Sequence, residues 1–440
     1  MEEEVGERSE VTLEEAVAIA LGLLRKAELE NADRVLGWVL EIQAEHADAL
    51  HFRGWIAHQQ GRNEEAVELI RRSLAVAPGY ADAHSNLGVV LGAMGRLDEA
   101  ILACRRAIEL APNHANAYSN LGVLLRATGR PAEAEAAYRT ALGCDPDHVD
   151  ALHNLGTLLV GQERVREAVE CYCRVTTLRA RHPQARQALA LAHCTLGEID
   201  RAIAIYEQWL RDEPGDPIAQ HLLAACSGRA VPARASDAFV EKVFDDFAAS
   251  FDAKLEKLGC RAPALVAAAL ETSGLPRAAL LEVLDAGCGT GLCGPLIAPY
   301  ARRLTGVDLA ARMLERAAER QVYDALIKAE LTAYLEAHPA SFDLIVSADT
   351  LVYFGALEAV ITAAARALRP RGLLIFSVEA SDAADSGAYT LGSHGRYSHG
   401  SGYVEALLHK EGFAPDVTGA ELRMEAGLPV KGFVIRAARS

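Results

Sequence analysis

A period of 34 residues runs through the first half of the chain and limits its possible folds more than any other feature. Three segments align without gaps: ADAHSNLGVVLGAMGRLDEA from residue 81, ANAYSNLGVLLRATGRPAEA from residue 115 and VDALHNLGTLLVGQERVREA from residue 149. The same step gives further copies from residues 13, 47 and 183. Such a period is typical of stacked supersecondary units, each of which buries its apolar face against the next. We therefore expect six repeats over residues 13–216.

Small residues at fixed positions predict two antiparallel helices in each repeat. A glycine inside the first helix lets the second helix approach closely. A second glycine ends the first helix, because it tolerates the left-handed cap conformation, and a proline stops the second helix. These recurring residues are Gly54, Gly88, Gly122 and Gly156 in the first helix, Gly61, Gly95, Gly129 and Gly197 at the turn, Ala32, Ala66, Ala100, Ala134, Ala168 and Ala202 in the second helix, and Pro78, Pro112, Pro146 and Pro214 at the end.

This pattern resembles the tetratricopeptide repeat family, although Ala44 and Ala180 replace the terminal proline in two copies. The resemblance implies an all-α solenoid with a concave groove that binds a peptide or protein partner. Asn86, Asn120 and Asn154 share the sixth position of three successive repeats. In the similar repeats of peptide O-GlcNAc transferases such a ladder holds an extended peptide, and an amide can both donate to and accept from any peptide unit. The alternative is that these asparagines only pack between helices.

Composition excludes several other classes of partner. The net charge of −16 argues against a nucleic-acid binder held by phosphate contacts. No uncharged apolar run approaches about 18 residues, so we expect no membrane span. The nine cysteines include no CxxC pair, which argues against a zinc site or a disulfide framework. The first ten residues, MEEEVGERSE, do not read as a signal peptide. We therefore expect a cytoplasmic protein without a metal.

The composition changes after the repeats. A capping helix completes the array, which we place at residues 1–227, and GRAVPARAS at residues 228–236 has the prolines and small residues of a linker. Residues 237–440 form the second predicted domain. Its first part, residues 237–272, is helical and carries an apolar stripe.

From residue 280, strand-like and helix-like runs alternate, which predicts an α/β fold with an open, mostly parallel sheet. Helices are expected over residues 292–301, 310–320, 331–337, 357–368 and 402–410. The seven expected strands are residues 280–286, 304–308, 325–329, 342–347 and 373–378, followed by an antiparallel pair near 415–425 and 430–437.

The run LDAGCGTG at residues 284–291 follows the first of these strands. A dinucleotide site requires the spacing G-x-G-x-x-G and a helix N-terminus for the pyrophosphate. Here the spacing is G-x-G-x-G, and Asp285 beside the glycines would repel a pyrophosphate. A second acid, Asp308, ends the next strand and can accept from both hydroxyls of a ribose. The pattern suits a nucleoside that carries an ammonium and a sulfonium group.

The run VLDAGCGTGLCG with LTGVDLAARMLERA closely resembles class I S-adenosylmethionine-dependent methyltransferases, which have a Rossmann-like fold and release S-adenosylhomocysteine. The resemblance covers about residues 240–440. It implies that Asp285 and Gly287 meet the methionine end, that Asp308 holds the ribose and that Leu309 and Met313 flank the adenine. Glu330-Leu331 stands where Asp-Leu usually meets the adenine amine. The full set of residues assigned to the cofactor is Asp285, Gly287, Cys288, Gly289, Gly291, Asp308, Leu309, Met313, Glu330, Leu331 and Asp349.

In methyltransferases a segment like residues 237–272 folds over the cofactor as a lid. The lid residues expected here are Phe244, Phe247, Phe251 and Arg261, with plain helix packing as the alternative. Transfer to a protic acceptor needs a base, and the candidate catalytic residues are Tyr353, His394 and His399, with Asp349 as a further carboxylate. Arg396 and Arg423 are candidates for orienting an anionic substrate.

Three functions remain open at this stage. The first is a methyltransferase whose repeats recruit a peptide or protein substrate. The second is a small-molecule methyltransferase that uses its repeats only for assembly. The third is a scaffold without catalysis, and an NAD-dependent oxidoreductase is a distant fourth.

Overall fold

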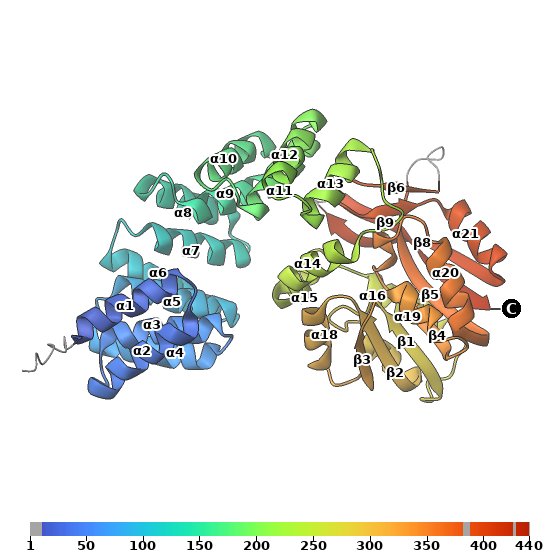
Figure 1. Cartoon of the computed structure of the whole chain (residues 1–440), viewed down its shortest axis with the longest axis horizontal. Helices are drawn as coiled ribbons and strands as arrows, with labels where there is room; N and C mark the ends of the chain where they lie inside the picture. The colour runs from blue at the N-terminus through green and yellow to red at the C-terminus, as the bar shows by residue number, and fades with distance from the viewer. Residues whose placement is uncertain (1–10, 382–387, 426–427, 440) are drawn as a thin grey trace, which may run out of the picture. The chain divides into compact units, whose positions relative to one another are not determined.

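The computed structural model describes residues 11–381, 388–425 and 428–439 (Figure 1). The chain divides into two compact units, and the second begins at His193. The division falls within α11 (Pro183–Thr195), earlier than the boundary after residue 227 that the sequence suggested.

The first unit consists of helix pairs in chain order, as the repeat predicts (Figure 1). In each pair the first helix has 13 residues and the second has 14. The helices are α1 (Leu13–Arg25), α2 (Leu29–Ile42), α3 (Ala47–Gln59), α4 (Asn63–Val76), α5 (Ala81–Ala93), α6 (Leu97–Leu110), α7 (Ala115–Ala127), α8 (Pro131–Cys144), α9 (Val149–Gly161) and α10 (Val165–Leu178).

The glycines of the first helices hold the pairs together. A Cβ atom at Gly54 would lie 2.7 Å from Cγ1 of Ile70, and one at Gly156 would lie 2.7 Å from Cε1 of Tyr172. The same relation joins Gly88 to Cys104 and Gly122 to Tyr138. In these four pairs, a side chain of the second helix therefore occupies the space that the glycine leaves.

The turns between paired helices adopt the left-handed conformation that the glycines predict. Gly61, Gly95 and Gly129 have φ of 79°, 74° and 73°. Ala27 and Glu163 stand at the equivalent positions of two other repeats and adopt the same conformation, with φ of 59° and 62°. The repeat fold thus imposes the left-handed turn even at residues whose Cβ atom makes this conformation unfavourable.

The second unit starts with the end of α11 and two further helices, α12 (Ile199–Asp212) and α13 (Pro217–Ser227). Residues 228–236, which we expected to form a linker, are packed against the α/β part. Arg234 forms an isolated antiparallel bridge with Phe354, and the Tyr397 hydroxyl donates to the Pro232 carbonyl at 2.8 Å. The segment is therefore packed as part of the second unit.

The α/β part follows, with helices α14 (Asp237–Phe247), α15 (Phe251–Lys257) and α16 (Ala262–Glu271) ahead of the sheet. The seven expected strands are present in the order β3-β2-β1-β4-β5, with β9 antiparallel to β5 and β8 antiparallel to β9. Two short strands, β6 and β7, extend the far end of β5. The strands are β1 (Leu281–Ala286), β2 (Ala301–Asp308), β3 (Ala325–Lys328), β4 (Phe342–Ser347), β5 (Leu368–Ala380), β6 (Tyr389–Leu391), β7 (Tyr397–His399), β8 (Phe413–Glu425) and β9 (Leu428–Arg439).

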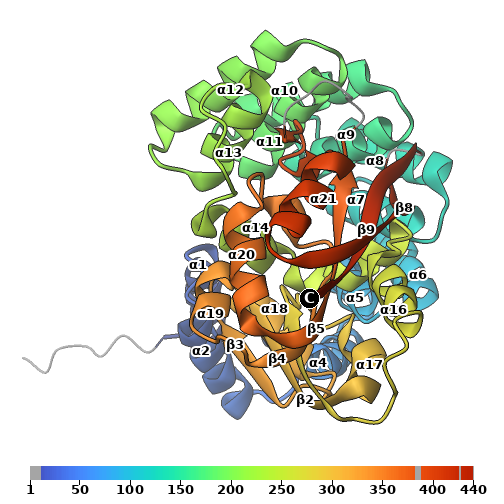
Figure 2. The same cartoon turned by 90° about the vertical axis from the view of Figure 1, so that its right-hand side faces the viewer.

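Helices cover both faces of the sheet (Figure 2). One core contains side chains of α19 (Leu331–Glu336), α20 (Glu358–Ala367) and α21 (Ser401–Lys410), and the other contains those of α16 and α17 (Gly294–Ile297). Helix α18 (Ala311–Ala318) lies between β2 and β3 in the chain. The fold class that the sequence predicts, a helical solenoid followed by a Rossmann-like α/β domain, is confirmed.

One expected helix is shorter than predicted. The sequence suggested a helix over residues 292–301, but α17 is followed by a 3-10 turn at Ala298–Tyr300, and β2 begins at Ala301. Pro299 lacks the backbone N–H that a continuing helix needs, which ends the helix early. No helix in the described part of the chain combines the length and apolar character needed to cross a bilayer.

Candidate active site

The glycine turn after β1 places three glycines in the left-handed region. Gly287, Gly289 and Gly291 have φ of 77°, 53° and 80°. A Cβ atom at Gly287 would lie 2.7 Å from Cβ of Thr350, and one at Gly291 would lie 2.9 Å from Cε2 of Tyr323. At Gly289 the first atom met is Cε1 of the Phe251 ring, at 4.0 Å. Gly287 and Gly291 therefore make room for protein side chains, whereas Gly289 presents bare backbone beside the Phe251 ring.

Asp285 is the penultimate residue of β1 and is 1% exposed. The Tyr323 hydroxyl donates to its Oδ2 at 2.6 Å. Burial raises the pKa of Asp285 to about 7, with a further contribution from the charge of Asp308, although the Tyr323 hydrogen bond opposes the shift. The carboxylate is thus held within the fold by Tyr323, a residue that sequence reasoning missed.

Asp308 ends β2 and lies beside the glycine turn. Its Oδ2 accepts from the Gly289 N–H at 2.9 Å, and its Oδ1 accepts from the Ala310 N–H at 2.9 Å. Burial raises the pKa of Asp308, although the hydrogen bonds from these backbone N–H groups act to lower it. Each carboxylate oxygen can accept a further hydrogen bond, so Asp308 retains the capacity to bind a pair of hydroxyl groups.

Three further residues assigned to the cofactor lie near the same edge of the sheet. Met313 is buried and packs with Phe244 and Phe251, and Leu309 is half-buried. Cys288 is buried below the turn, and its Sγ would lie 3.0 Å from a Cβ atom at Gly306.

Glu330 has a structural task at the start of α19. Its two carboxylate oxygens accept from the backbone N–H groups of Thr332 and Ala333, at 3.0 and 2.8 Å, which caps the helix. Leu331 points into the core. At the end of β3, Lys328 pairs with Glu241 of α14 at 2.9 Å, an ion pair that the sequence did not indicate.

The helical segment that the sequence marked as a lid lies against the glycine turn. The Asp245 carboxylate accepts from the Arg312 N–H at 3.0 Å. Asp252 accepts from the Thr290 hydroxyl, and it pairs with Arg320 at 2.6 Å. These contacts join α14 and α15 to the first two βα connections.

The phenylalanine rings of α14 and α15 lie in two different environments. The Phe244 and Phe251 rings meet edge to face, with centroids 5.9 Å apart, and both contact Met313. The Phe247 ring is 40% exposed, and the Lys254 ammonium lies 3.6 Å from its centroid. Arg261 is exposed, and its N–H donates to the Leu422 carbonyl at 2.7 Å. Of the four residues predicted for a lid, Phe244 and Phe251 are those that pack with Met313, and Phe251 also lies beside Gly289.

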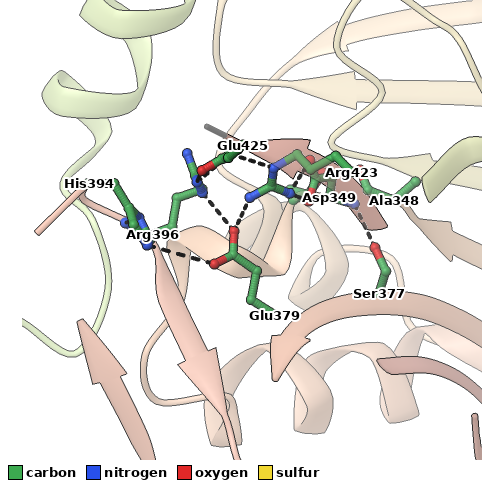
Figure 3. Close-up of polar contacts among 9 residues, drawn as sticks. Ala348, Asp349, Ser377, Glu379, His394, Arg396, Arg423 and Glu425 are labelled. Carbon is green, nitrogen blue, oxygen red and sulfur yellow. Dashed lines mark hydrogen bonds and ion pairs between the residues drawn. The ribbon is translucent and has the colours of Figure 1, made fainter. Parts of the chain in front are cut away.

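A network of charged residues occupies the carboxyl ends of β4 and β5 (Figure 3). Arg423 of β8 binds both oxygens of Asp349, at 2.9 and 3.1 Å, and pairs with Glu379 of β5. Arg396 bonds to Glu379 at 2.6 Å and to both oxygens of Glu425, at 2.6 and 2.7 Å. Arg423 completes the ring by donating to Glu425 at 2.7 Å. In the pairs with Asp349 and Glu425, a single guanidinium nitrogen, Nη1 of Arg423 or Nη2 of Arg396, contacts both carboxylate oxygens.

The network joins the glycine turn through the loop after β4. Asp349 has a φ of 56°, rare for a residue with a side chain, and its N–H donates to the Ser377 hydroxyl at 2.9 Å. The next residue, Thr350, donates to the Gly287 carbonyl at 3.0 Å. The Asp349 carboxylate is therefore held between the glycine turn and the end of β5.

Two carboxylates of the network, Asp349 and Glu425, have pKa values shifted in opposite directions. Burial raises the pKa of Asp349, although the Arg423 guanidinium acts in the opposite direction. Burial would also raise the pKa of Glu425, but Arg396 and Arg423 hold it below its usual range. The Asp349 side chain is 24% exposed, whereas that of Glu379 is 6% exposed. Asp349 thus combines a raised pKa with access to its surroundings.

Residues 284–376 match the family described as a methyltransferase domain. Residues 79–147, 17–83 and 153–217 match families described as tetratricopeptide repeats. The chain carries tetratricopeptide repeats and a methyltransferase domain. Both resemblances that the sequence suggested are thereby confirmed.

Two curated relatives resemble the methyltransferase domain. A ubiquinone biosynthesis O-methyltransferase of Idiomarina loihiensis is 36% identical over 102 residues, 22% of this chain and 41% of that protein. A malonyl-[acyl-carrier protein] O-methyltransferase of Enterobacter lignolyticus is 33% identical over 108 residues, 24% of this chain and 43% of that protein. The chain spans about two fifths of the length of these relatives.

Among solved structures, pilF of Pseudomonas aeruginosa aligns with 48% of this chain and 96% of its own, at 21% identity and a TM-score of 0.42.

The catalytic candidates of the methyltransferase domain occupy different environments. Tyr353 lies beside Phe244, with ring centroids 5.3 Å apart, and burial raises its pKa to about 12. His394 lies 4.0 Å from Glu379, and its Nδ1 accepts from the Arg396 N–H at 3.2 Å. Burial lowers the pKa of His394. His399 is fully buried, and its Nε2 donates to the Gly355 carbonyl at 3.0 Å. The His399 ring is thus held inside the fold by a backbone hydrogen bond, and its catalytic role stays a prediction.

The three asparagines of the repeat array are half-buried. The Asn86 amide donates to His51 Nε2 at 2.8 Å, and the Asn120 amide donates to the Ser85 hydroxyl at 3.1 Å. Each bond joins a first helix to that of the preceding repeat, so these amides do contribute to packing. One N–H and the carbonyl oxygen of each amide remain for a ligand.

Within the described residues, no group of three or more His, Cys, Asp and Glu side chains is arranged to hold a metal ion.

Proposed function

We propose that the protein is an S-adenosylmethionine-dependent methyltransferase whose repeats recruit a peptide or protein substrate. The observation that carries the first part is the position of Asp308, whose carboxylate is fixed by the N–H groups of Gly289 and Ala310 at the glycine turn. The family match over residues 284–376 supports it. The two O-methyltransferases named above support an oxygen acceptor, but they share only this domain.

The residues present fit the methyl donor. Asp308 would accept from the two ribose hydroxyls, and Gly289 would let the backbone approach the ligand closely. Met313 and Phe251 supply apolar contact for the base. When bound, S-adenosylmethionine supplies a methyl group that the sulfonium already activates, so the protein has to orient the acceptor and exclude water. The lid contacts of Asp245 and Asp252 serve that exclusion.

We assign to Asp349 the role of the general base, which removes the proton of a protic acceptor. It lies next to Thr350, which touches the glycine turn, and its raised pKa suits a general base. Arg423 acts as a positioning residue, because it fixes both oxygens of the Asp349 carboxylate. Tyr353 and Phe244 form an aromatic wall beside this carboxylate, and His394 has a weaker claim because its Nδ1 is already engaged.

Binding of the donor tests the first part. Calorimetry on the full chain should show micromolar binding of S-adenosylmethionine and no binding of NAD. Asp308→Ala should weaken binding by at least tenfold, whereas the control Asp416→Ala, which removes an exposed carboxylate paired with Arg436, should leave it unchanged. Equal affinity of the wild-type and Asp308→Ala proteins would refute the assignment.

Labelled donor distinguishes an enzyme from a scaffold. The full chain with labelled donor and a cell lysate should transfer label to a protein, and Asp349→Asn should reduce transfer while donor affinity stays within twofold. Binding without transfer to any acceptor would favour the scaffold.

The role of the repeats requires a separate variant. Replacing Asn86, Asn120 and Asn154 with alanine should reduce protein labelling and leave donor binding intact. Label found only on small molecules, with no effect of the triple variant, would favour the alternative in which the repeats serve assembly. The cytoplasmic location stays a prediction.

A further inference from the structure

Two cysteines of the second unit lie in direct contact. Cys194 near the end of α11 and Cys226 near the end of α13 have their Sγ atoms 3.2 Å apart, at a sequence separation of 32. A disulfide requires about 2.05 Å, so a shift of little more than 1 Å would bring the sulfur atoms to bonding distance. Both side chains are half-buried, which leaves them within reach of a small oxidant.

The pair also differs from the other cysteines in its ionisation. A hydrogen bond from the Cys226 thiol lowers the pKa of Cys194, and the same contact raises that of Cys226. Burial raises the pKa of Cys104, Cys288 and Cys293. The thiolate is the reactive form of cysteine, and each thiol can donate a hydrogen bond to the thiolate of the other, so the contact suits a pair in which one cysteine reacts first and the other second.

We propose that Cys194 and Cys226 form a reversible oxidation site, at which hydrogen peroxide converts the two thiols into a disulfide between α11 and α13. The Cys194 thiolate attacks one peroxide oxygen, the O–O bond breaks, and a sulfenic acid and hydroxide form. The Cys226 sulfur then attacks the Cys194 sulfur and displaces the hydroxyl group, which leaves as water with the Cys226 proton. Two thiols lose two electrons, and one peroxide becomes two water molecules.

The disulfide would fix a helix that contacts the methyltransferase domain. In α13, the His221 imidazole donates to the Gly395 carbonyl at 2.8 Å and stacks on Phe239 of α14 with centroids 4.1 Å apart. Asp216, the N-cap of α13, pairs with Lys242 at 2.6 Å. Closing the loop from Cys194 to Cys226 restricts the unfolded chain, so the oxidised protein should unfold at a higher temperature than the reduced one.

Peptide mapping of the full chain tests the site. The reduced protein is exposed to a small excess of hydrogen peroxide, blocked with iodoacetamide, digested and analysed by mass spectrometry without reductant. We expect a peptide pair linked through Cys194 and Cys226, 2 Da lighter than the two thiol peptides together, that a phosphine reductant separates. The thermal midpoint should rise by several degrees and return on reduction.

Single cysteine-to-serine variants test whether these two residues form the link. Cys194→Ser and Cys226→Ser should each abolish the linked peptide and the rise in thermal midpoint, whereas Cys171→Ser should retain both. Full iodoacetamide labelling of both residues after peroxide would overturn the proposal, as would sulfinic acid at Cys194 without a link. The wild-type mapping requires no variant to fold and no knowledge of the methyl acceptor.

Discussion

The buried carboxylate of Asp285 gives the sharpest prediction for stability. Its pKa of about 7 in the folded protein compares with 3.8 in a model peptide. As pH rises from about 4 to about 7, the unfolded chain releases this proton before the folded one does, so the folded state loses stability. The full difference is about 4 kcal/mol, at about 1.4 kcal/mol per pKa unit. At 1% exposure, solvent screening does not reduce this penalty appreciably.

Asp285→Asn removes the titrating group and keeps an oxygen that can accept from the Tyr323 hydroxyl. The variant should therefore gain stability over the wild type as pH rises, by about 3 kcal/mol between pH 5 and pH 8. For a unit of this size the gap between thermal midpoints should widen by roughly 6–12 °C. Differential scanning calorimetry of the ligand-free chain at pH 5, 6, 7 and 8 measures this gap. Asp416→Asn, which removes an exposed carboxylate, is the control. A gap that stays constant across this range would show that Asp285 does not retain its proton in the fold.

Three further substitutions test other parts of the structure. Arg423→Met removes the partner of Asp349 and one of the two arginine partners of Glu379 and Glu425, and should cost about 1–3 kcal/mol, seen as a lower thermal midpoint of the second unit; a neutral result would show that the network does not contribute to folding. Gly287→Ala forces a left-handed alanine against Thr350 and should cost about 2–5 kcal/mol in urea unfolding, whereas Gly79→Ala, with open space around it, should change the midpoint little. Glu163→Gly relieves a left-handed φ of 62° and should stabilise the repeats by about 0.5–1 kcal/mol, so a loss of stability would contradict the strain.

The repeats were predictable because their signals are local. Each turn glycine acts on its own backbone, and each repeat reports the same 34-residue unit again. The open, mostly parallel sheet followed from alternating strands and helices, and the spacing from Asp285 to Asp308 follows from two adjacent parallel strands whose ends meet at one edge.

The site's polar contacts were not predictable in the same way. Tyr323 reaches Asp285 across 38 residues, and Arg423 reaches Asp349 across 74. Such pairs depend on side-chain directions that a strand pattern does not specify. Glu379 could have been noticed as an acid at the end of the apolar run IFSV, but its partners could not.

Residues 228–236 show a related limit. Prolines and small residues indicate that a segment does not form a regular helix or strand. They do not indicate which part of the protein the segment packs against.

The helix-pair contacts of the array have a consequence for its evolution. The glycine that leaves a gap and the side chain that fills it belong to the same 34-residue segment, as with Gly122 and Tyr138 or Gly156 and Tyr172. Duplicating or deleting a whole repeat moves both halves of the contact together. The array can therefore change length in steps of one repeat while each new copy arrives with its internal fit already made.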